Sequence, residues 1–418
     1  AEGDAGDDPS LLAQNFLGDD RTDIKPGDRV LLIIEDDATF ARVLFDLVRS
    51  MGFKCLAAAS GEVGLALAHA FKPDAITLDL GLPGVDGWIV LDRLKHSPRT
   101  RHISVHVITA DEAGRRRSLQ LGALDFLTKP VTAEALALAL GEVKGLVERR
   151  VNHLLLVEDN DVERGAIVEL IGNHDATVTE AASGKEALSA LVTERFDCMV
   201  LDLNLGDMSG FDVIDRIKAD SRLEALPIIV YTGRELTREE TDGLALRTDA
   251  IVLKSVHSSE ELLDQTTLYL HRNEAKLPAP KRQMLKKVRE SDPVFAGKTV
   301  LVVDDDVRNI FAVTSVLERH KMTVLFAENG RKGIEVLEKN PAVALVLMDV
   351  MMPEMDGYEA TCAIRSVAKY ASLPIIALTA KAMKDDRAKC RAAGASDYVA
   401  KPVEAEQLLS VLRVWLHS

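Results

Sequence analysis

Short apolar runs alternate with amphipathic stretches along most of the chain, and the same order recurs three times. The runs are four or five residues long, and the stretches between them have the 3.6-residue periodicity of helices. Strands that are apolar throughout are typical of a parallel sheet with both faces covered. The first run of each copy ends in two acids: residues 30–34 before Glu35 and Asp36, 154–157 before Glu158 and Asp159, and 300–303 before Asp304 and Asp305.

Three further apolar runs in each copy end at a polar residue of fixed type. The second run is followed by Asp, the third by Thr and the fourth by Lys. From the second acid of the pair to this Asp there are 43, 43 and 44 residues, and from the Asp to the Thr there are 30 in every copy. Such agreement indicates a repeated domain. The three sets are Asp79, Thr109 and Lys129; Asp202, Thr232 and Lys254; and Asp349, Thr379 and Lys401.

The alternation of buried strands and helices predicts three consecutive α/β domains, each a doubly wound parallel (βα)5 sheet. In the first copy we expect helices over 39–50, 61–70, 88–96, 113–121 and 132–148. The predicted domains are residues 29–149, 150–272 and 299–418. Residues 1–28 carry eight acids against two bases, which indicates a flexible acidic tail. Residues 273–298 form a predicted basic linker, with a helix over 281–290.

Composition narrows the class of protein. A formal net charge of -15 argues against general nucleic-acid binding, which needs a basic face. No apolar run approaches the roughly 18–20 residues that cross a membrane. The four cysteines form no CxxC pair, so we expect reduced thiols and a cytoplasmic protein. The chain begins with Ala1 rather than Met, which suggests a processed product or a piece of a longer chain.

The polar residues that follow the strands suggest a common chemistry. Ligands of open α/β sheets bind beyond the carboxyl ends of the strands, so three carboxylates, a hydroxyl and an ammonium should share one crevice. Mg²⁺ prefers oxygen ligands and often binds carboxylates together with phosphate oxygens. An Asp carboxylate can attack a phosphoryl donor, while a Lys neutralises charge on the transferred group. The pattern therefore predicts Mg²⁺-dependent phosphoryl transfer onto aspartate.

The three copies resemble receiver domains of bacterial two-component systems. In the first copy Asp79 is followed by Pro83 and by Asp86-Gly87, and Lys129 by Pro130; the third copy repeats this pattern. The resemblance covers residues 29–272 and 299–418. It implies a flavodoxin-like fold, and it implies that Asp79, Asp202 and Asp349 accept phosphoryl groups from phosphohistidine.

The resemblance also implies further roles at each site. The Thr and Lys residues would assist catalysis, and Phe126 and Tyr398 occupy the place of the family's switch aromatic; core packing is an equal alternative for Phe126. The middle copy has Ile251 there. The residues implied to bind Mg²⁺ (or Mn²⁺), with main-chain carbonyls from Gly81, Asn204 and Met351, are Glu35, Asp36 and Asp79; Glu158, Asp159 and Asp202; and Asp304, Asp305 and Asp349.

The middle copy departs from the family's pattern. It lacks the Pro after the acceptor Asp, and it has Gly233 after Thr232 and Ser255 after Lys254. The Lys-Pro bond of receivers is typically cis, and a non-proline cis bond costs about 2.5–4 kcal/mol. We therefore expect the bond before Ser255 to be strained or trans, the Lys254 amine to be displaced, and Asp202 to be the slowest acceptor.

Three functions remain open. The chain is the receiver part of a hybrid histidine kinase, a free-standing multi-receiver regulator, or a docking scaffold with vestigial sites. No Gly-rich ATP-binding motif and no helix-turn-helix occurs, so we expect a phosphoacceptor with autophosphatase activity rather than a kinase. The expected partners are a histidine kinase domain in cis or trans, and a histidine phosphotransfer protein or downstream response regulator, with no DNA or membrane contact.

Overall fold

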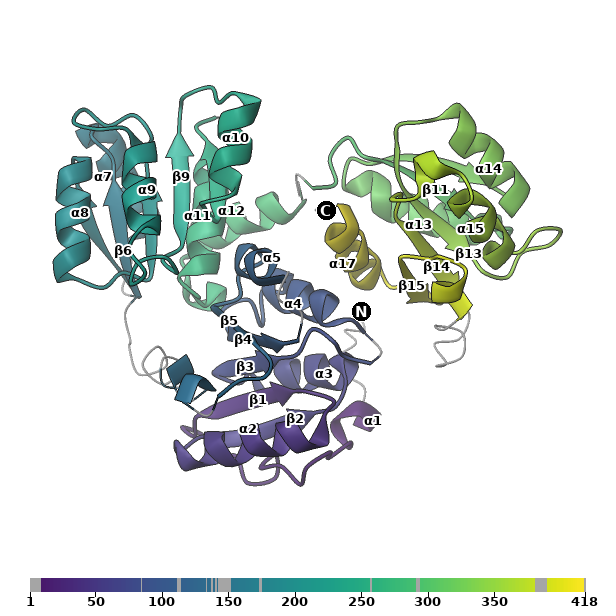
Figure 1. Cartoon of the computed structure of the whole chain (residues 1–418), viewed down its shortest axis with the longest axis horizontal. Coiled ribbons are helices and arrows are strands. Elements are labelled where there is room, and N and C mark those ends of the chain that lie inside the picture. The colour runs from purple at the N-terminus through teal and green to yellow at the C-terminus, as the bar shows by residue number, and fades with distance from the viewer. Residues whose placement is uncertain are drawn as a thin grey trace. The chain divides into compact units, whose positions relative to one another are not determined.

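A computed structural model of the chain contains three five-stranded parallel sheets, each flanked by helices on both faces (Figure 1). It falls into two compact units, Ala1–Lys286 and Lys287–Ser418. The described residues are 9–83, 85–110, 114–132, 134–136, 138–139, 141, 152–172, 175–255, 258–290, 294–379 and 389–416.

The first sheet has the strand order β2-β1-β3-β4-β5. One apolar cluster, around Leu32 and Leu78, packs between one face of the sheet and helices α3 and α4. A second, around Ile33 and Phe45, packs between the other face and α2. Strands and helices therefore form three layers. The strands are β1 (Val30–Ile34), β2 (Lys54–Ala58), β3 (Ala75–Leu78), β4 (Ser104–Thr109) and β5 (Asp125–Thr128), and the helices are α2 (Ala38–Ser50), α3 (Gly61–Phe71), α4 (Gly87–His96) and α5 (Arg115–Gln120). Much of the predicted helix 132–148 lies outside the described residues.

The second sheet repeats this order as β10-β9-β8-β6-β7. Its two faces also carry separate apolar clusters, one around Leu155 and one around Leu156. Its strands are β6 (Asn152–Val157), β7 (Ala176–Ala181), β8 (Cys198–Leu201), β9 (Ile228–Thr232) and β10 (Ala250–Leu253). Its helices are α7 (Asp161–Ile171), α8 (Gly184–Thr193), α9 (Gly210–Lys218), α10 (Arg238–Ala245) and α11 (Ser258–Tyr269).

The third sheet has the order β12-β11-β13-β14-β15, so all three sheets have the predicted doubly wound parallel topology. Its strands are β11 (Thr299–Val303), β12 (Thr323–Ala327), β13 (Val343–Asp349), β14 (Ile375–Thr379) and β15 (Asp397–Ala400). Its helices are α13 (Val307–Arg319), α14 (Gly330–Lys339), α15 (Gly357–Arg365), the 3-10 turn η4 (Ala368–Tyr370) and α17 (Ala405–Leu416).

The acidic N-terminal segment packs against the first sheet over its described residues, and the expectation of a flexible tail is wrong there. Helix α1 (Pro9–Leu12) contacts α3. Asp20 is 3% exposed, forms an ion pair with Arg49, and accepts a hydrogen bond from the Cys55 N–H at 2.9 Å. Asp19 accepts one from the Ala57 N–H at 3.0 Å. These carboxylates satisfy backbone donors along the open edge of β2, so they have partners that a solvated tail would lack.

The basic linker is helical and lies on the second domain. After the 3-10 turn η3 (Glu274–Lys276), helix α12 runs over Ala279–Glu290, close to the predicted 281–290. Leu285 is fully buried against Leu263 and Leu277. The Lys281 ammonium donates to the main-chain oxygens of Glu169 and Gly172, both at 3.2 Å. This arrangement anchors one face of the helix, while Arg282, Lys286 and Lys287 are exposed.

The first and second domains touch near the amino ends of their strands, through the segment before β4 and the helices α5 and α11. Arg101, between α4 and β4, forms a buried ion pair with Asp264 of α11 and lies 3.6 Å from Glu274. The Tyr269 hydroxyl donates to the Gln120 main-chain oxygen at 3.1 Å. These contacts involve residues that precede β4, β5 and β10, so they lie at the end of the sheets opposite Asp79 and Asp202.

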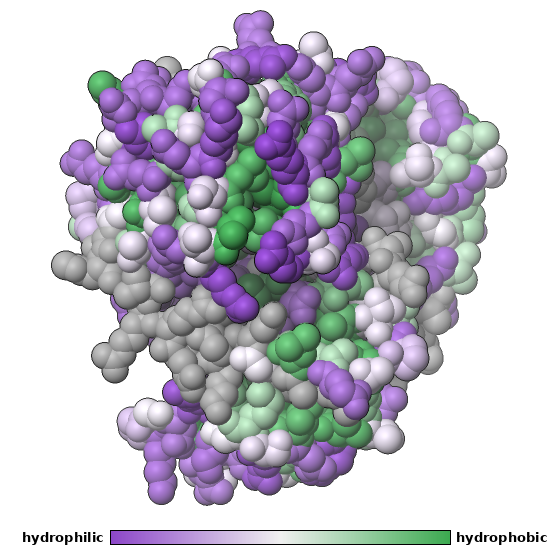
Figure 2. Space-filling view, turned by 60° about the vertical axis from the view of Figure 1, so that its left-hand side comes forward, coloured by the Kyte–Doolittle hydropathy of each residue, from purple (hydrophilic) through white to green (hydrophobic). Residues whose placement is uncertain are grey.

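On the face shown in Figure 2, hydrophilic side chains cover much of the surface and hydrophobic ones appear between them. Large exposed hydrophobic side chains include Val162, Phe311 and Phe326. Among the described residues, no helix is both long and apolar enough to span a membrane.

Candidate functional sites

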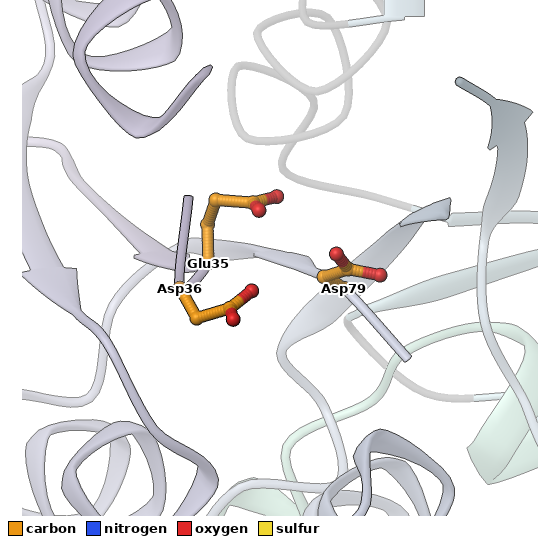
Figure 3. Close-up of side chains that lie close together, drawn as sticks. All are labelled: Glu35, Asp36 and Asp79. Carbon is orange, nitrogen blue, oxygen red and sulfur yellow. The ribbon is translucent and has the colours of Figure 1, made fainter. Parts of the chain in front are cut away.

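The acid pair and the predicted acceptor Asp of each domain lie at the ends of the two strands between which the strand order reverses. In the first sheet β1 pairs with β2 on one side and β3 on the other, so the ends of β1 and β3 frame the crevice. Glu35 and Asp36 follow β1, and Asp79 follows β3. Figure 3 shows the three side chains gathered at this edge of the sheet.

The residue after each acid pair has a structural role. Asp37, Asn160 and Asp306 are the N-caps of α2, α7 and α13, and each side chain accepts hydrogen bonds from main-chain N–H groups of the first helical turn. The cap begins the helix directly after the acids, which holds them at the end of the strand.

A glycine eight residues after each acceptor Asp allows the following loop to fold back onto the strand. A Cβ atom on Gly87 would lie 2.4 Å from the Asp79 main-chain oxygen, and one on Gly357 would lie 2.1 Å from that of Asp349. Only glycine tolerates such an approach. The Asp-Gly pairs therefore position the acceptor aspartate rather than only forming turns.

In the first domain one lysine bridges two acids. The Lys129 Nζ atom lies 2.7 Å from the Glu35 carboxylate and 2.7 Å from Asp79 Oδ2. The other oxygen of Asp79 accepts the Gly81 N–H at 3.0 Å. Carboxylate oxygens of Glu35, Asp36 and Asp79 all lie within 4.8 Å of one another, with Asp36 exposed and the other two buried.

The third domain repeats this geometry. The Lys401 Nζ atom lies 2.6 Å from Asp304 and 2.8 Å from Asp349. Carboxylate oxygens of Asp304, Asp305 and Asp349 again lie within 4.8 Å of one another. Three converging carboxylates, one of them open to solvent, fit a hard divalent cation such as Mg²⁺, which prefers oxygen ligands and keeps several waters.

Burial and charge shift the titration of these groups. Burial raises the pKa of the Glu35 and Asp349 carboxyls, although the neighbouring lysine ammonium opposes the shift in each case. Burial also disfavours the charge on Lys129, but its hydrogen bonds to Asp79 and Glu35 outweigh this and raise the pKa of the lysine. Burial likewise disfavours the charge on Lys401, and its hydrogen bonds to Asp304 and Asp349 outweigh this and raise its pKa. The ammonium groups of Lys129 and Lys401 therefore stay charged beside the carboxylates of Asp79 and Asp349.

The second domain differs in its acids. Lys254 contacts Asp202 at 2.8 Å and Glu158 at 2.9 Å, so its amine reaches the acceptor carboxylate and the expected displacement is not seen. The described residues gather no three-carboxylate group in this domain like those of the other two. Oδ2 of Asp159 instead faces Gly206, 3.6 Å from where a Cβ atom would stand.

The peptide bond after the site lysine also differs between the domains. The cis bonds found among the described residues are Lys129-Pro130 and Lys401-Pro402, and the Lys254-Ser255 bond is not one of them.

The threonines and the aromatic positions are placed as follows. Thr109, Thr232 and Thr379 end β4, β9 and β14 and are buried. Phe126 is 3% exposed and lies within the apolar core of the first domain, as the core-packing alternative predicts. Tyr398 is partly buried beside Val350 and Cys390. A switch role for either aromatic stays a prediction.

Sequence reasoning missed one position in each site. It lies on the first helix, four residues after the second acid, and is Phe40, Glu163 or Asn309. Each of these side chains contacts a site residue. The signal available was the constant spacing, but the residue types differ and so do not form a motif.

Comparison with known proteins agrees with the geometry. The family described as the response regulator receiver domain matches residues 31–141, 154–266 and 300–413. The chain belongs to this family. We call its three domains receivers 1, 2 and 3.

The relatives differ in kind. The chain is 36% identical to PilH of Pseudomonas aeruginosa over 28% of its own length and 96% of that protein. It is 31% identical to the histidine-protein kinase BarA of Escherichia coli, over 46% of this chain and 19% of BarA. It is 27% identical to the response regulator PleD of Caulobacter vibrioides, over 55% of this chain and 56% of PleD.

A similar solved structure is the receiver domain of the sensor histidine kinase PA1611 from Pseudomonas aeruginosa. It is 35% identical, covers 29% of this chain and all of that domain, and has a TM-score of 0.28.

Proposed function

We propose that this chain is a phosphorelay component that accepts phosphoryl groups from phosphohistidine onto aspartate, with Mg²⁺ as cofactor. The observation that carries the proposal is the assembly in receivers 1 and 3 of three carboxylates within 4.8 Å, with a lysine ammonium 2.7–2.8 Å from the acceptor oxygen. An array that served only for docking would have no need to keep either group in place.

The acceptor step uses residues that already face one another. A carboxylate oxygen of Asp79 or Asp349 attacks phosphorus, the N–P bond of phosphohistidine breaks, and the imidazole leaves with its electron pair and is protonated. Lys129 or Lys401 then pairs with a phosphoryl oxygen, and the buried Thr109 or Thr379 hydroxyl lies at the end of the adjacent strand. Bound Mg²⁺ would neutralise charge on the transferred group, held by the acid pair and the acceptor aspartate.

The relatives suggest two settings for this chemistry. BarA is a histidine-protein kinase and PleD is a response regulator. Each is similar in sequence to this chain over about half of this chain's length. We infer that the chain is the receiver part of a hybrid kinase, with a histidine kinase domain as donor and a histidine phosphotransfer protein or response regulator as acceptor. The free-standing regulator is the alternative, and the reading frame before Ala1 separates the two. We propose a reducing, cytoplasmic setting, because the four cysteines are thiols.

The test is phosphoryl transfer to chains in which one acceptor remains. Full-length chains with two of the three aspartates changed to Asn are treated with acetyl phosphate and Mg²⁺, and the added mass is assigned by peptide mapping. We expect Asp79 and Asp349 to be modified, and Asp36→Asn or Asp305→Asn to abolish modification of the receiver that carries it. A folded chain modified at neither Asp79 nor Asp349 would be the docking scaffold instead.

A further inference from the structure

One position on the first helix of each receiver contacts the site with a different chemical group. In receiver 1 the Lys129 ammonium lies 4.7 Å from the centre of the Phe40 ring. In receiver 3 the Asn309 amide donates to both oxygens of Asp304, at 3.1 and 3.3 Å. In receiver 2 the position is Glu163, an acid. The three sites therefore differ in charge at a point that the shared motif does not specify.

Glu163 binds the lysine of its site. Its Oε2 atom lies 2.6 Å from Lys254 Nζ, closer than Asp202 at 2.8 Å or Glu158 at 2.9 Å. Asp202 and Glu158 are less than 10% exposed, whereas Glu163 is 46% exposed. The lysine is thus held between the floor of the site and an acid at its rim, and the Tyr231 ring lies 5.2 Å from the ammonium.

This geometry gives receiver 2 one acid more than its neighbours. The lysines of receivers 1 and 3 each contact two carboxylates among the described residues, and Lys254 contacts three. Lys129 also makes three hydrogen bonds, but to two carboxylates, so a phosphoryl oxygen that pairs with Lys254 competes with one acid more. The extra negative charge also repels an anionic phosphoryl donor and attracts a divalent cation.

We propose that Glu163 is a positioning residue that sets receiver 2 apart: it holds Lys254, makes Asp202 a slow phosphoryl acceptor, and attracts a cation to this site more strongly than a neutral side chain would. This inference rests on the proposed function. It gives slow modification of Asp202 a different physical cause from the one that the sequence suggested. The amine of Lys254 is already in place beside Asp202, so slowness comes from competition for the amine and from charge, and not from a misplaced lysine.

The test is Glu163→Gln, which removes the charge and keeps the length of the side chain. In the full chain with Asp79→Asn and Asp349→Asn, we expect Asp202 to be modified by acetyl phosphate about fivefold faster, the scale of one partly exposed ion pair. In the chain with Asp36→Asn and Asp305→Asn, we expect calorimetry to show Mg²⁺ binding to receiver 2 weakened about threefold by the lost charge. Opposite changes in rate and affinity would not follow from a purely structural role.

The matched control is Glu169→Gln, which removes an exposed acid from the same helix six residues farther from the crevice. It should leave both values unchanged; an equal effect would mean that general charge, and not Glu163, is the cause. A further arm is Asn309→Glu in receiver 3, which should slow modification of Asp349 and tighten Mg²⁺ binding, whereas the uncharged Asn309→Gln should not tighten it.

The outcomes separate the two proposals. If Asp79 and Asp349 accept phosphoryl groups but Glu163→Gln leaves the Asp202 rate unchanged, the inference about Glu163 is wrong and the proposed function stands. If none of the three aspartates is modified, the proposed function fails, and unchanged Mg²⁺ affinity in Glu163→Gln would reject the role of Glu163 as well.

Discussion

Lys95 is a buried cation near the end of helix α4 in receiver 1. It is 1% exposed, and its ammonium donates to the main-chain oxygens of Ile103 at 2.7 Å and Arg101 at 3.4 Å. No carboxylate is among these partners. Burial, with a smaller contribution from the charge of Arg101, lowers the pKa of Lys95 to about 7.

This shift predicts that receiver 1 becomes more stable as the pH rises above 7. The unfolded chain keeps the lysine proton up to a pKa near 10.4, while the folded chain releases it near 7, so the unfolded state binds more protons in between. The stabilisation is complete above the unfolded pKa and is lost as the pH falls through 7. Relative to Lys95→Met, the free energy of unfolding should rise by about 2 kcal/mol between pH 7 and pH 9.

Denaturant unfolding followed by Trp88 fluorescence would measure this difference, in a chain where Trp415→Phe removes the other tryptophan. Side-chain NMR of the lysines offers a direct check, since a resonance titrating near pH 7 should vanish in Lys95→Met. A stability difference that does not change with pH would mean that Lys95 stays charged in the folded chain.

The residues that carry chemistry were predictable where the fold itself requires them. Asp79, Thr109 and Lys129 follow apolar strands at fixed spacing, so their convergence on one crevice could be read from the order of the strands. Glu163 could not be found in this way, because an acid on the polar face of a helix looks the same whether it faces water or a lysine. Lys95 was equally hidden, since its burial depends on a loop that the chain adds later.

At the scale of elements, the strand edges show what periodicity can and cannot predict. Strands and helices followed the pattern of the sequence closely, as α2 and α3 show, because both faces of each sheet must be covered. The N-terminal segment did not, because its acids look solvated in the sequence. Two of them, Asp19 and Asp20, are buried by partners far along the chain: the β2 backbone and Arg49.

Asp20 should therefore matter more to stability than an exposed acid of the same segment. Asp20→Ala leaves the Cys55 N–H without its carboxylate partner and removes the partner of Arg49, so receiver 1 should lose about 2 kcal/mol. Asp23→Ala, at an exposed position, should change stability by less than about 0.5 kcal/mol. The Trp88 assay described for Lys95 would measure both.

The pH dependence of this effect has a defined sign. The hydrogen bond from Arg49 holds the pKa of Asp20 below its usual value. The stability it provides is present above the unfolded pKa near 3.9 and is lost as the pH falls. The gap between the wild-type chain and Asp20→Ala should narrow in acid; a gap that stays constant would mean that the carboxylate acts only by packing.

At the scale of the whole molecule, receivers 1 and 2 belong to one compact unit and receiver 3 to another. The short spacing between the first two domains predicts a semi-rigid pair, through a last helix that runs into the next strand; that helix lies mainly outside the described residues. The contacts seen instead come from α11, the end of α5 and the segment before β4. Arg101 is 6% exposed there, paired with Asp264 and close to Glu274.

We predict that Arg101 holds this junction. Arg101→Ala would leave two acids buried without their cation, and breaking one partner of a buried ion pair costs about 3–5 kcal/mol. The loss should fall on the junction, because the pair joins two domains with separate cores. Replacing the cation and both acids, as Arg101→Met with Asp264→Leu and Glu274→Met, should restore much of it, since three apolar groups need no charged partner. Hydrogen exchange would then show α11 and residues 97–103 exposed together in Arg101→Ala, protected again in the triple variant, and unaffected by Arg99→Ala in the same loop. Equal exchange in all four chains would mean that contacts other than the Arg101 ion pair hold the two receivers together.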